Sequence, residues 1–323
     1  MSKAAAATLA LVAFVSMIFI GQCNAALRIG FYKGKCQSID VETTVFNVIK
    51  SKFKNDSTIT AALLRLQFHD CFVTGCDASL LLDGKHSEKT AFPNLSVRGY
   101  EIIDAAKAAI EETCPDVVSC ADIIAMATRD AVSLSGGGRY EVQTGRRDGN
   151  ASSSANVFLP GPSDSISDAI DIFATKGLNS TDMVFLLGAH TVGVAHCSFV
   201  QDRLYNFQNT GKPDPSMDTK LVSKLRRTCP QDSGFNKTVN LDQNPLSSMT
   251  LDNSYYKQII SHKGILEIDQ NLALDPLTKD KVNSIANSSD FSSKFGQVMV
   301  KLGALDVLTG NQGEIRRSCQ KVN

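Results

Sequence analysis

Two side chains that could move a proton and stabilise a charge lie four residues apart near position 65. Arg65 and His69 belong to the apolar segment RLQFHDCF, and a helix would present both on one face. An imidazole can accept and return a proton, and a guanidinium can stabilise a developing anion. Because burying an unused guanidinium costs roughly several kcal/mol, we favour a functional role for Arg65 over a surface position.

The same segment runs into an oxygen-rich stretch, VTGCDAS. Asp70, Asp77 and Ser79, with carbonyls of the short loop from Cys71 to Cys76, offer the hard oxygen ligands that calcium prefers. The spacing differs from that of an EF-hand, and a solvated acidic turn is the alternative interpretation.

A second histidine, His190, follows another apolar segment, MVFLLGA. Taken alone, His69 and His190 would each more often be packed core histidines than ligands or bases. Thr191, Asp242 and Asp252 could form a second oxygen site near His190, although nothing in the local sequence shows that they meet.

Residues 1–25 predict a secretory signal peptide, with Lys3, an apolar run over residues 4–20 and small residues up to Ala25. A membrane anchor is less favoured because the run is short and contains polar residues.

The predicted signal peptide contains one of the 33 basic residues, Lys3, and one of the nine cysteines, Cys23. The mature chain therefore has 32 basic residues, 33 acidic residues and eight cysteines. The even number indicates four disulfides, whose pairing the spacing leaves open. The near-neutral charge gives no indication of a nucleic-acid partner.

The mature chain of about 300 residues can form one large domain or two packed halves. Six glycosylation sequons fit a secreted protein, although some would be unused. They are Asn55, Asn94, Asn150, Asn179, Asn236 and Asn287.

Helical periodicity dominates the pattern of apolar residues, so we predict a mainly α protein. The predicted helices cover residues 41–53, 59–68, 100–110, 121–134, 166–174 and 295–305. A short helix over MVFLLGAH has candidate N-cap oxygens in Ser180, Thr181 and Asp182. The best strand candidate is RYEVQT, residues 139–144, and residues 148–164 have the composition of a long loop between two helical halves.

Together, the motifs resemble the secretory plant-type heme peroxidases, also called class III peroxidases. The resemblance covers the mature chain, residues 26–323, in the family's order. Its motifs are GFY with Cys36, RLQFHDCFVTGCDASLLL, FPNLSVRGYEIID, CPDVVSCADIIA, GRRDG, LPGP, LLGAHTVGVAHC, DRLYNF and TGNQGEIRRSC. It implies a two-domain helical fold with heme b between a distal half (roughly 26–150) and a proximal half (roughly 165–300).

By this resemblance, hydrogen peroxide is reduced to water while phenolic donors are oxidised in one-electron steps, through a ferryl intermediate. His69 is the general acid and base, Arg65 stabilises charge, and His190 binds the iron. Asn94 accepts a hydrogen bond from His69, which would leave its sequon buried and unglycosylated. Asp269 supports the other nitrogen of His190.

The resemblance also implies two calcium ions, four disulfides and a buried ion pair of Asp122 with Arg146. The first calcium would use Asp70, Val73, Gly75, Asp77, Ser79 and Glu88. The second would use Thr191, Asp242, Ser247 and Asp252. The disulfides would be Cys36–Cys114, Cys71–Cys76, Cys120–Cys319 and Cys197–Cys229.

The donor would meet the exposed heme edge at Pro160, with Phe92 and Phe199 as weaker candidates for which apolar packing is an equally good explanation. The absence of tryptophan excludes electron transfer through a tryptophan radical. No acidic cluster for manganese can be assigned.

Two departures from the family pattern stand near the proximal histidine. The link QNPLSSMTL, between Asp242 and Asp252, is two residues longer than usual and lacks the expected threonine, so Ser247 is the substitute ligand. Leu241 and Val192 replace larger residues, which could loosen packing there.

Two other functions are less favoured. A secreted cell-wall glycoprotein with a silent heme site is opposed by the intact Arg65, His69, Asn94, His190 and Asp269. A zinc module using His69 and Cys71 ranks last, because the cysteines are expected to form disulfides. We expect a monomer that is secreted to the cell wall, or to the vacuole, without a membrane association after signal removal.

Overall fold

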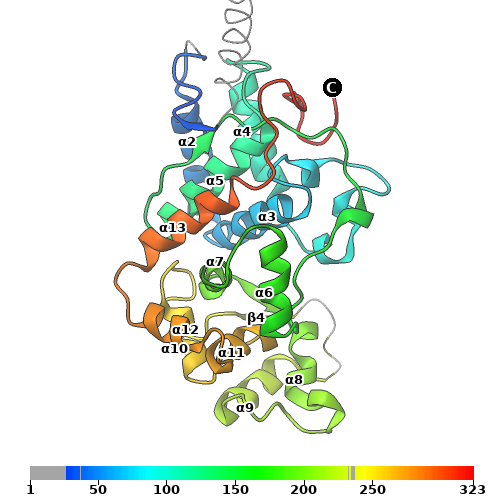
Figure 1. Cartoon of the computed structure of the whole chain (residues 1–323), viewed down its shortest axis with the longest axis vertical. Helices are drawn as coiled ribbons and strands as arrows, with labels where there is room; N and C mark the ends of the chain where they lie inside the picture. Colours follow the sequence, from blue (N-terminus) through cyan, green and yellow to red (C-terminus); the bar gives the residue numbers. More distant parts are fainter. Residues whose placement is uncertain (1–26, 37, 232, 234–236) are drawn as a thin grey trace, which may run out of the picture.

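The computed structural model describes residues 27–36, 38–231, 233 and 237–323 (Figure 1). The predicted signal peptide and the Asn236 sequon lie outside these residues. The first group of helices is α2 (Val41–Asn55), α3 (Ile59–Val73), α4 (Tyr100–Glu111) and α5 (Cys120–Leu134). The second group is α6 (Ile166–Thr175), α7 (Ser180–Leu187), α8 (Gln201–Tyr205), α9 (Thr219–Thr228), α10 (Ser254–Ile260), α11 (Glu267–Leu274), α12 (Lys279–Ala286) and α13 (Phe291–Leu302).

The predicted mainly α fold is confirmed, and most predicted helices occur within a few residues of their expected bounds. Two hydrophobic cores divide the described residues. One core is formed mainly by α2, α3, α4 and α5, and the other by α6 to α13 with part of α3. Helix α3 therefore contributes to both cores, and in Figure 1 it lies between the two groups of helices.

The strand prediction was largely wrong. Only Gln143–Thr144 (β2) of the segment RYEVQT is a strand, because its antiparallel partner, Arg28–Ile29 (β1), is two residues long. A second antiparallel pair joins Val194–His196 (β3) to Thr238–Asn240 (β4). Residues 148–164 form the predicted long loop, with one 3₁₀ turn at Ser154–Asn156 (η4), and lead from the first group of helices to α6.

The N-cap of α7 is Asn179 rather than the predicted residues 180–182. Its side-chain oxygen accepts hydrogen bonds from the backbone N–H groups of Thr181 and Asp182, at 2.9 and 3.0 Å. The Asp182 carboxylate accepts the Asn179 N–H in return, which completes a capping box. This cap fixes the start of the helix that leads to His190.

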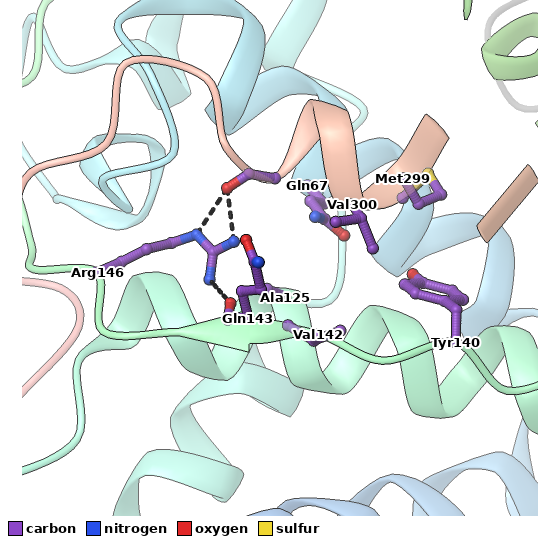
Figure 2. A pocket seen from close by; sticks show the side chains of 9 residues that line it. Gln67, Ala125, Tyr140, Val142, Gln143, Arg146, Met299 and Val300 are labelled. Carbon is purple, nitrogen blue, oxygen red and sulfur yellow. Dashed lines mark hydrogen bonds between the residues drawn. The ribbon is translucent and has the colours of Figure 1, made fainter. Parts of the chain in front are cut away.

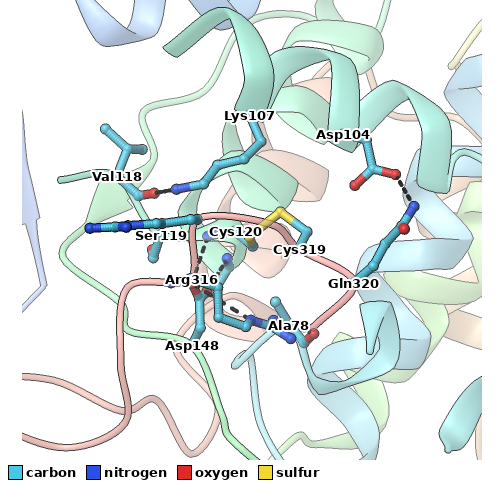
Figure 3. The surroundings of a disulfide bond; sticks show 12 residues. Ala78, Asp104, Lys107, Val118, Ser119, Cys120, Asp148, Arg316, Cys319 and Gln320 are labelled. Atoms are coloured by element: carbon cyan, nitrogen blue, oxygen red, sulfur yellow. Dashed lines mark hydrogen bonds and ion pairs between the residues drawn. A yellow bond between two sulfur atoms is a disulfide. The ribbon is translucent and has the colours of Figure 1, made fainter. Parts of the chain in front are cut away.

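The C-terminal segment is fastened back onto the first group of helices. The disulfide Cys120–Cys319 joins residues 199 apart in the sequence. Beside it, the buried Asp148 carboxylate accepts hydrogen bonds from the N–H groups of Cys120, Ala121 and Arg316, at 2.9–3.1 Å (Figure 3). One carboxylate thus caps α5 and holds the tail.

The expected ion pair of Asp122 with Arg146 is present and buried, with Nη1 2.7 Å from the carboxylate. Arg146 also donates to the Gly303 and Gln143 carbonyls, which ties the end of α13 to β2 (Figure 2). A cavity of about 10 Å³ lies beside it, lined by Gln67 and Tyr140 among others. This is room for about one water molecule, so the cavity is too small for a substrate or a cofactor.

Candidate active site

Helix α3 presents Arg65 on its one accessible face. The accessible side chains of α3 are Ala61, Arg65 and Phe68, at helical spacings of four and three, whereas the rest of the helix is buried. Arg65 is accessible but surrounded by protein, and this desolvation lowers the pKa of its guanidinium. A buried apolar helix thus presents a cation on its one accessible face.

His69 is held by partners on both ring nitrogens. Nδ1 lies 2.6 Å from Asn94 Oδ1, and Asn94 Nδ2 donates to the Glu88 carbonyl at 2.8 Å, which fixes the orientation of the amide. Arg65 Nε donates to His69 Nε2 at 3.2 Å. Since Nε2 accepts this hydrogen bond, the proton of the neutral ring must lie on Nδ1 and be donated to Asn94.

Burial keeps His69 neutral. Desolvation is the main cause that lowers its pKa to about 3, the charge of Arg65 lowers it further, and the hydrogen bond to Asn94 opposes both. His69 is therefore a neutral base over the physiological pH range, with the lone pair of Nε2 accepting from Arg65.

His190 lies in a 3₁₀ turn, Gly188–Thr191 (η5), that continues from α7. Its Nδ1 is 2.8 Å from Asp269 Oδ1, so Nε2 remains available for a metal. The His190 side chain is 29% exposed, whereas Asp269 is 1% exposed. Segment 191–193 packs closely on α3, since a Cβ on Gly193 would lie 2.8 Å from the Ala61 Cβ. The second imidazole thus stands on an element that contacts α3.

The oxygen-rich stretch after α3 is a buried group of carboxylates. Asp70 accepts hydrogen bonds from the N–H groups of Ala78 and Leu80, at 3.0 and 3.3 Å, and Asp77 accepts one from Ser79 N at 2.9 Å. Glu88 is fully buried, and neither of its carboxylate oxygens makes a hydrogen bond of standard geometry, while the Ser79 and Ser152 side chains lie near enough to lower its pKa.

These carboxylates repel one another. Desolvation, followed by the charges of Asp77 and Glu88, raises the pKa of Asp70. Desolvation likewise raises the pKa of Asp77, and that of Glu88 to about 7. Buried acidic groups with unpartnered oxygens are suited to a hard cation, so the residues present fit calcium.

Side-chain carboxylates alone would not complete this site. Among the described residues, no three His, Cys, Asp or Glu side chains form a metal-binding group. A cation would also need the Ser79 hydroxyl and backbone carbonyls such as those of Val73 and Gly75. Lys176 Nζ already donates to the Val73 carbonyl at 2.9 Å.

The candidate residues for a second cation lie in two neighbouring pairs. Thr191 Oγ1 is 3.1 Å from Asp252 Oδ1, and Ser247 Oγ is 2.8 Å from Asp242 Oδ2. Ser254 connects the pairs, because its N–H donates to Asp252 and its hydroxyl oxygen lies 2.9 Å from that of Ser247. Desolvation, with a contribution from the charge of Asp252, raises the pKa of Asp242.

The donor-site candidates differ in exposure. Phe92 is 65% exposed in the turn Phe92–Asn94 (η3), whereas Phe199 is partly packed against the second core. Pro160 is half-buried in the long loop. Leu241 and Val192 are both buried in the second core.

Comparison with known proteins decides the family. The family model described as Peroxidase matches residues 45–288. The chain belongs to the plant (class III) peroxidase family. Peroxidase 60 of Arabidopsis thaliana is 55% identical over 301 residues, which cover 92% of this chain and 90% of that protein. Peroxidase 57 of Arabidopsis thaliana is 51% identical (93% of each chain), and Peroxidase N1 of Nicotiana tabacum is 42% identical (92% and 90%).

The chain is therefore a heme peroxidase, an oxidoreductase that acts on hydrogen peroxide with donor substrates. The residues of this peroxidase fit the cofactor. His190 offers a free Nε2 backed by Asp269, and α3 offers the accessible face with Arg65.

The four disulfides of the peroxidase join the cysteine pairs that the resemblance implied. The zinc hypothesis was wrong, because Cys71 is bonded to Cys76 and has no thiolate to offer. None of the helices among the described residues has the length and hydropathy of a membrane span.

Sequence reasoning missed Tyr255, whose hydroxyl donates to Asp269 at 2.8 Å. It also missed Lys176, which reaches the Val73 carbonyl from the second group of helices. Neither residue has a signal in the local sequence, because each contact joins segments that are distant along the chain.

Proposed function

We propose that His69 and Arg65 carry out the cleavage of hydrogen peroxide in this peroxidase, with His190 as the iron ligand. The observation that carries this proposal is the state of His69: a neutral ring, held by Asn94 at Nδ1, with the lone pair of Nε2 directed at Arg65. When bound through His190, the heme supplies the iron on which the peroxide oxygens are reduced.

Each residue has one task in this scheme. His69 Nε2 takes a proton from one peroxide oxygen and returns it to the other, which leaves as water. Asn94 stabilises the imidazolium that exists between these two transfers, and Arg65 stabilises the negative charge on the separating oxygens. Overall, one hydrogen peroxide and two phenols give two waters and two phenoxyl radicals.

We propose small phenols as donors, meeting the protein beside Pro160 and the exposed Phe92. The lack of tryptophan supports direct contact between donor and heme edge over transfer from a remote surface residue. Phe199 is a weaker candidate because it is partly packed in the core.

We infer two structural calcium ions. The first would be bound by Asp70, Asp77, Ser79 and the carbonyls of Val73 and Gly75, with Glu88 nearby as an additional buried charge. The unpartnered oxygens of Glu88 support this assignment. The second would be bound by Thr191, Asp242, Ser247 and Asp252.

We infer that the protein is a secreted monomer of the cell wall or vacuole. The eight cysteines of the mature chain are all paired in disulfides, which is typical of proteins that pass through an oxidising compartment. Four of its sequons, Asn55, Asn150, Asn179 and Asn287, are exposed, whereas Asn94 is buried.

The test is the visible spectrum of the heme-reconstituted protein before and after one equivalent of hydrogen peroxide, and again after guaiacol. We expect a Soret band that shifts with peroxide and returns with the phenol. His69→Leu should retain the band and react about 10²–10⁴ times more slowly, if it loses a positioned acid and base. His86→Leu, at an exposed histidine, is the control and should behave like the wild type. An unchanged rate in His69→Leu would refute the assignment.

A further inference from the structure

Two donors share one oxygen behind the proximal histidine. Asp269 Oδ1 lies 2.8 Å from His190 Nδ1 and 2.8 Å from the hydroxyl of Tyr255. The three residues come from three different elements, η5, α10 and α11. The contact is therefore built by the packing of the second core rather than by local sequence.

The arrangement is buried and geometrically defined. Tyr255 and Asp269 are each 1% exposed, and the Tyr255 ring stands edge-on to the His190 imidazole, with centroids 6.1 Å apart and an interplanar angle of 83°. Asp269 lies in the first turn of α11, and the Tyr255 hydroxyl donates to its Oδ1. A carboxylate oxygen accepts hydrogen bonds, so the imidazole Nδ1–H donates to the same oxygen.

An oxygen that accepts two hydrogen bonds accepts each of them less strongly than it would accept one. A hydroxyl that donates to the carboxylate withdraws part of the negative charge that His190 Nδ1–H would otherwise meet. In a low-dielectric interior this effect is larger than it would be in water. The hydrogen bond from His190 to Asp269 is therefore weaker with Tyr255 than without it.

We propose that Tyr255 is a positioning residue that sets how strongly Asp269 polarises the iron ligand His190. The proposal rests on the proposed function, in which His190 binds iron through Nε2. A more strongly polarised imidazole is a more anionic ligand and favours ferric over ferrous iron. Tyr255 thus keeps the reduction potential higher than a carboxylate with a single donor would.

The chain offers a matched control in the adjacent residue. Tyr256 lies in the same helix, is fully buried, and donates its hydroxyl to the Val184 carbonyl at 3.0 Å. Tyr255→Phe and Tyr256→Phe each remove one buried, hydrogen-bonded hydroxyl from α10. Only the first removes a donor to Asp269.

The experiment measures the ferric/ferrous midpoint potential and the iron–histidine stretching band of the ferrous holoenzyme. We expect Tyr255→Phe to shift the reduction equilibrium roughly tenfold toward ferric iron, about 59 mV for one electron, and to raise the stretching frequency. Tyr256→Phe should stay within about threefold of the wild type, because its hydroxyl does not touch Asp269.

Site-specific replacement of Tyr255 by 3-fluorotyrosine is a second test that retains the hydroxyl and does not depend on Tyr255→Phe folding well. Its more acidic hydroxyl is a stronger donor and should shift the equilibrium in the opposite direction. Equal shifts in Tyr255→Phe and Tyr256→Phe, or an unshifted potential in the fluorinated protein, would overturn the proposal. A wild-type protein without an iron–histidine band would overturn the proposed function instead.

Discussion

Replacing Asn94 by leucine tests whether the hydrogen bond at His69 Nδ1 assists proton transfer. The wild-type bond is 2.6 Å long and lies in a buried setting, with Asn94 2% exposed. In the proposed mechanism His69 accepts a proton from peroxide, and this bond then changes from a neutral to a charge-assisted one. Its contribution to stabilising the charged form is then larger than its contribution to the resting state.

The magnitude follows from that difference. A neutral hydrogen bond contributes about 0.5–1.5 kcal/mol and one to a charged group about 1.5–3 kcal/mol, so the transition state loses about 1–2 kcal/mol more than the ground state. Since each 1.36 kcal/mol is tenfold in rate, the reaction of Asn94→Leu with peroxide should slow by about 5–30-fold. Stopped-flow measurement of the Soret change against peroxide concentration gives this rate constant.

Asn94→Asp is the matched control because both variants lose the donor to the Glu88 carbonyl. The aspartate keeps an acceptor for His69 and should raise the pKa of the ring, so the rate at pH 7 should stay within about threefold of wild type. If both variants slow by the same factor, the bond to Glu88 matters and not the one to His69. A wild-type rate in Asn94→Leu would also refute the reasoning.

The other predictions concern the iron ligand, pH, a disulfide and calcium. His190→Ala should abolish stable heme binding, and a normal heme spectrum in that variant would refute the ligand assignment. With the pKa of His69 lowered to about 3, the peroxide rate should be flat from pH 7 to about pH 4.5 and fall below that. In the heme-free protein, the stability contributed by the neutral His69 is full above the unfolded pKa of about 6.5 and is lost as pH falls toward 3, which acid titration of unfolding can follow. Removing Cys120–Cys319, which closes a loop of 199 residues, should cost about 5 kcal/mol of unfolding free energy in denaturant titrations. Chelation by EGTA should lower Tm and slow the peroxide reaction, and readdition of calcium should restore both.

Most of the fold could be predicted because the helices are amphipathic and long. Helices α2, α4, α5 and α6 begin and end within about two residues of the bounds that apolar spacing predicted. Short helices such as α8 (five residues) and α10 (seven residues) have too few turns to show a period, so the sequence did not reveal them. The strand over residues 139–144 failed because strand length depends on a partner, and β1 offers only two residues.

The sequence indicated individual site residues, but it did not indicate which distant residues they contact. Arg65 and His69 share one helix, so their spacing alone indicated a pair. Asn94 follows His69 by 25 residues and Asp269 follows His190 by 79, and no local pattern joins them. Only the resemblance to a family suggested those contacts, and it did not suggest Tyr255. Side chains that act through another residue leave weaker signals than those that carry the chemistry.

One chain of contacts explains why calcium should matter to proton transfer. The buried Glu88 side chain belongs to the acidic group at the first proposed calcium site, whereas its backbone carbonyl accepts the hydrogen bond that orients Asn94. Asn94 in turn fixes His69, and His69 is followed directly by Asp70 of the same acidic group. Without a cation, repulsion among Asp70, Asp77 and Glu88 favours protonation or separation of these carboxylates. Either change reaches His69 by two routes, through the adjacent Asp70 and through Glu88, whose carbonyl orients Asn94. We therefore expect metal binding to be coupled to the geometry of His69.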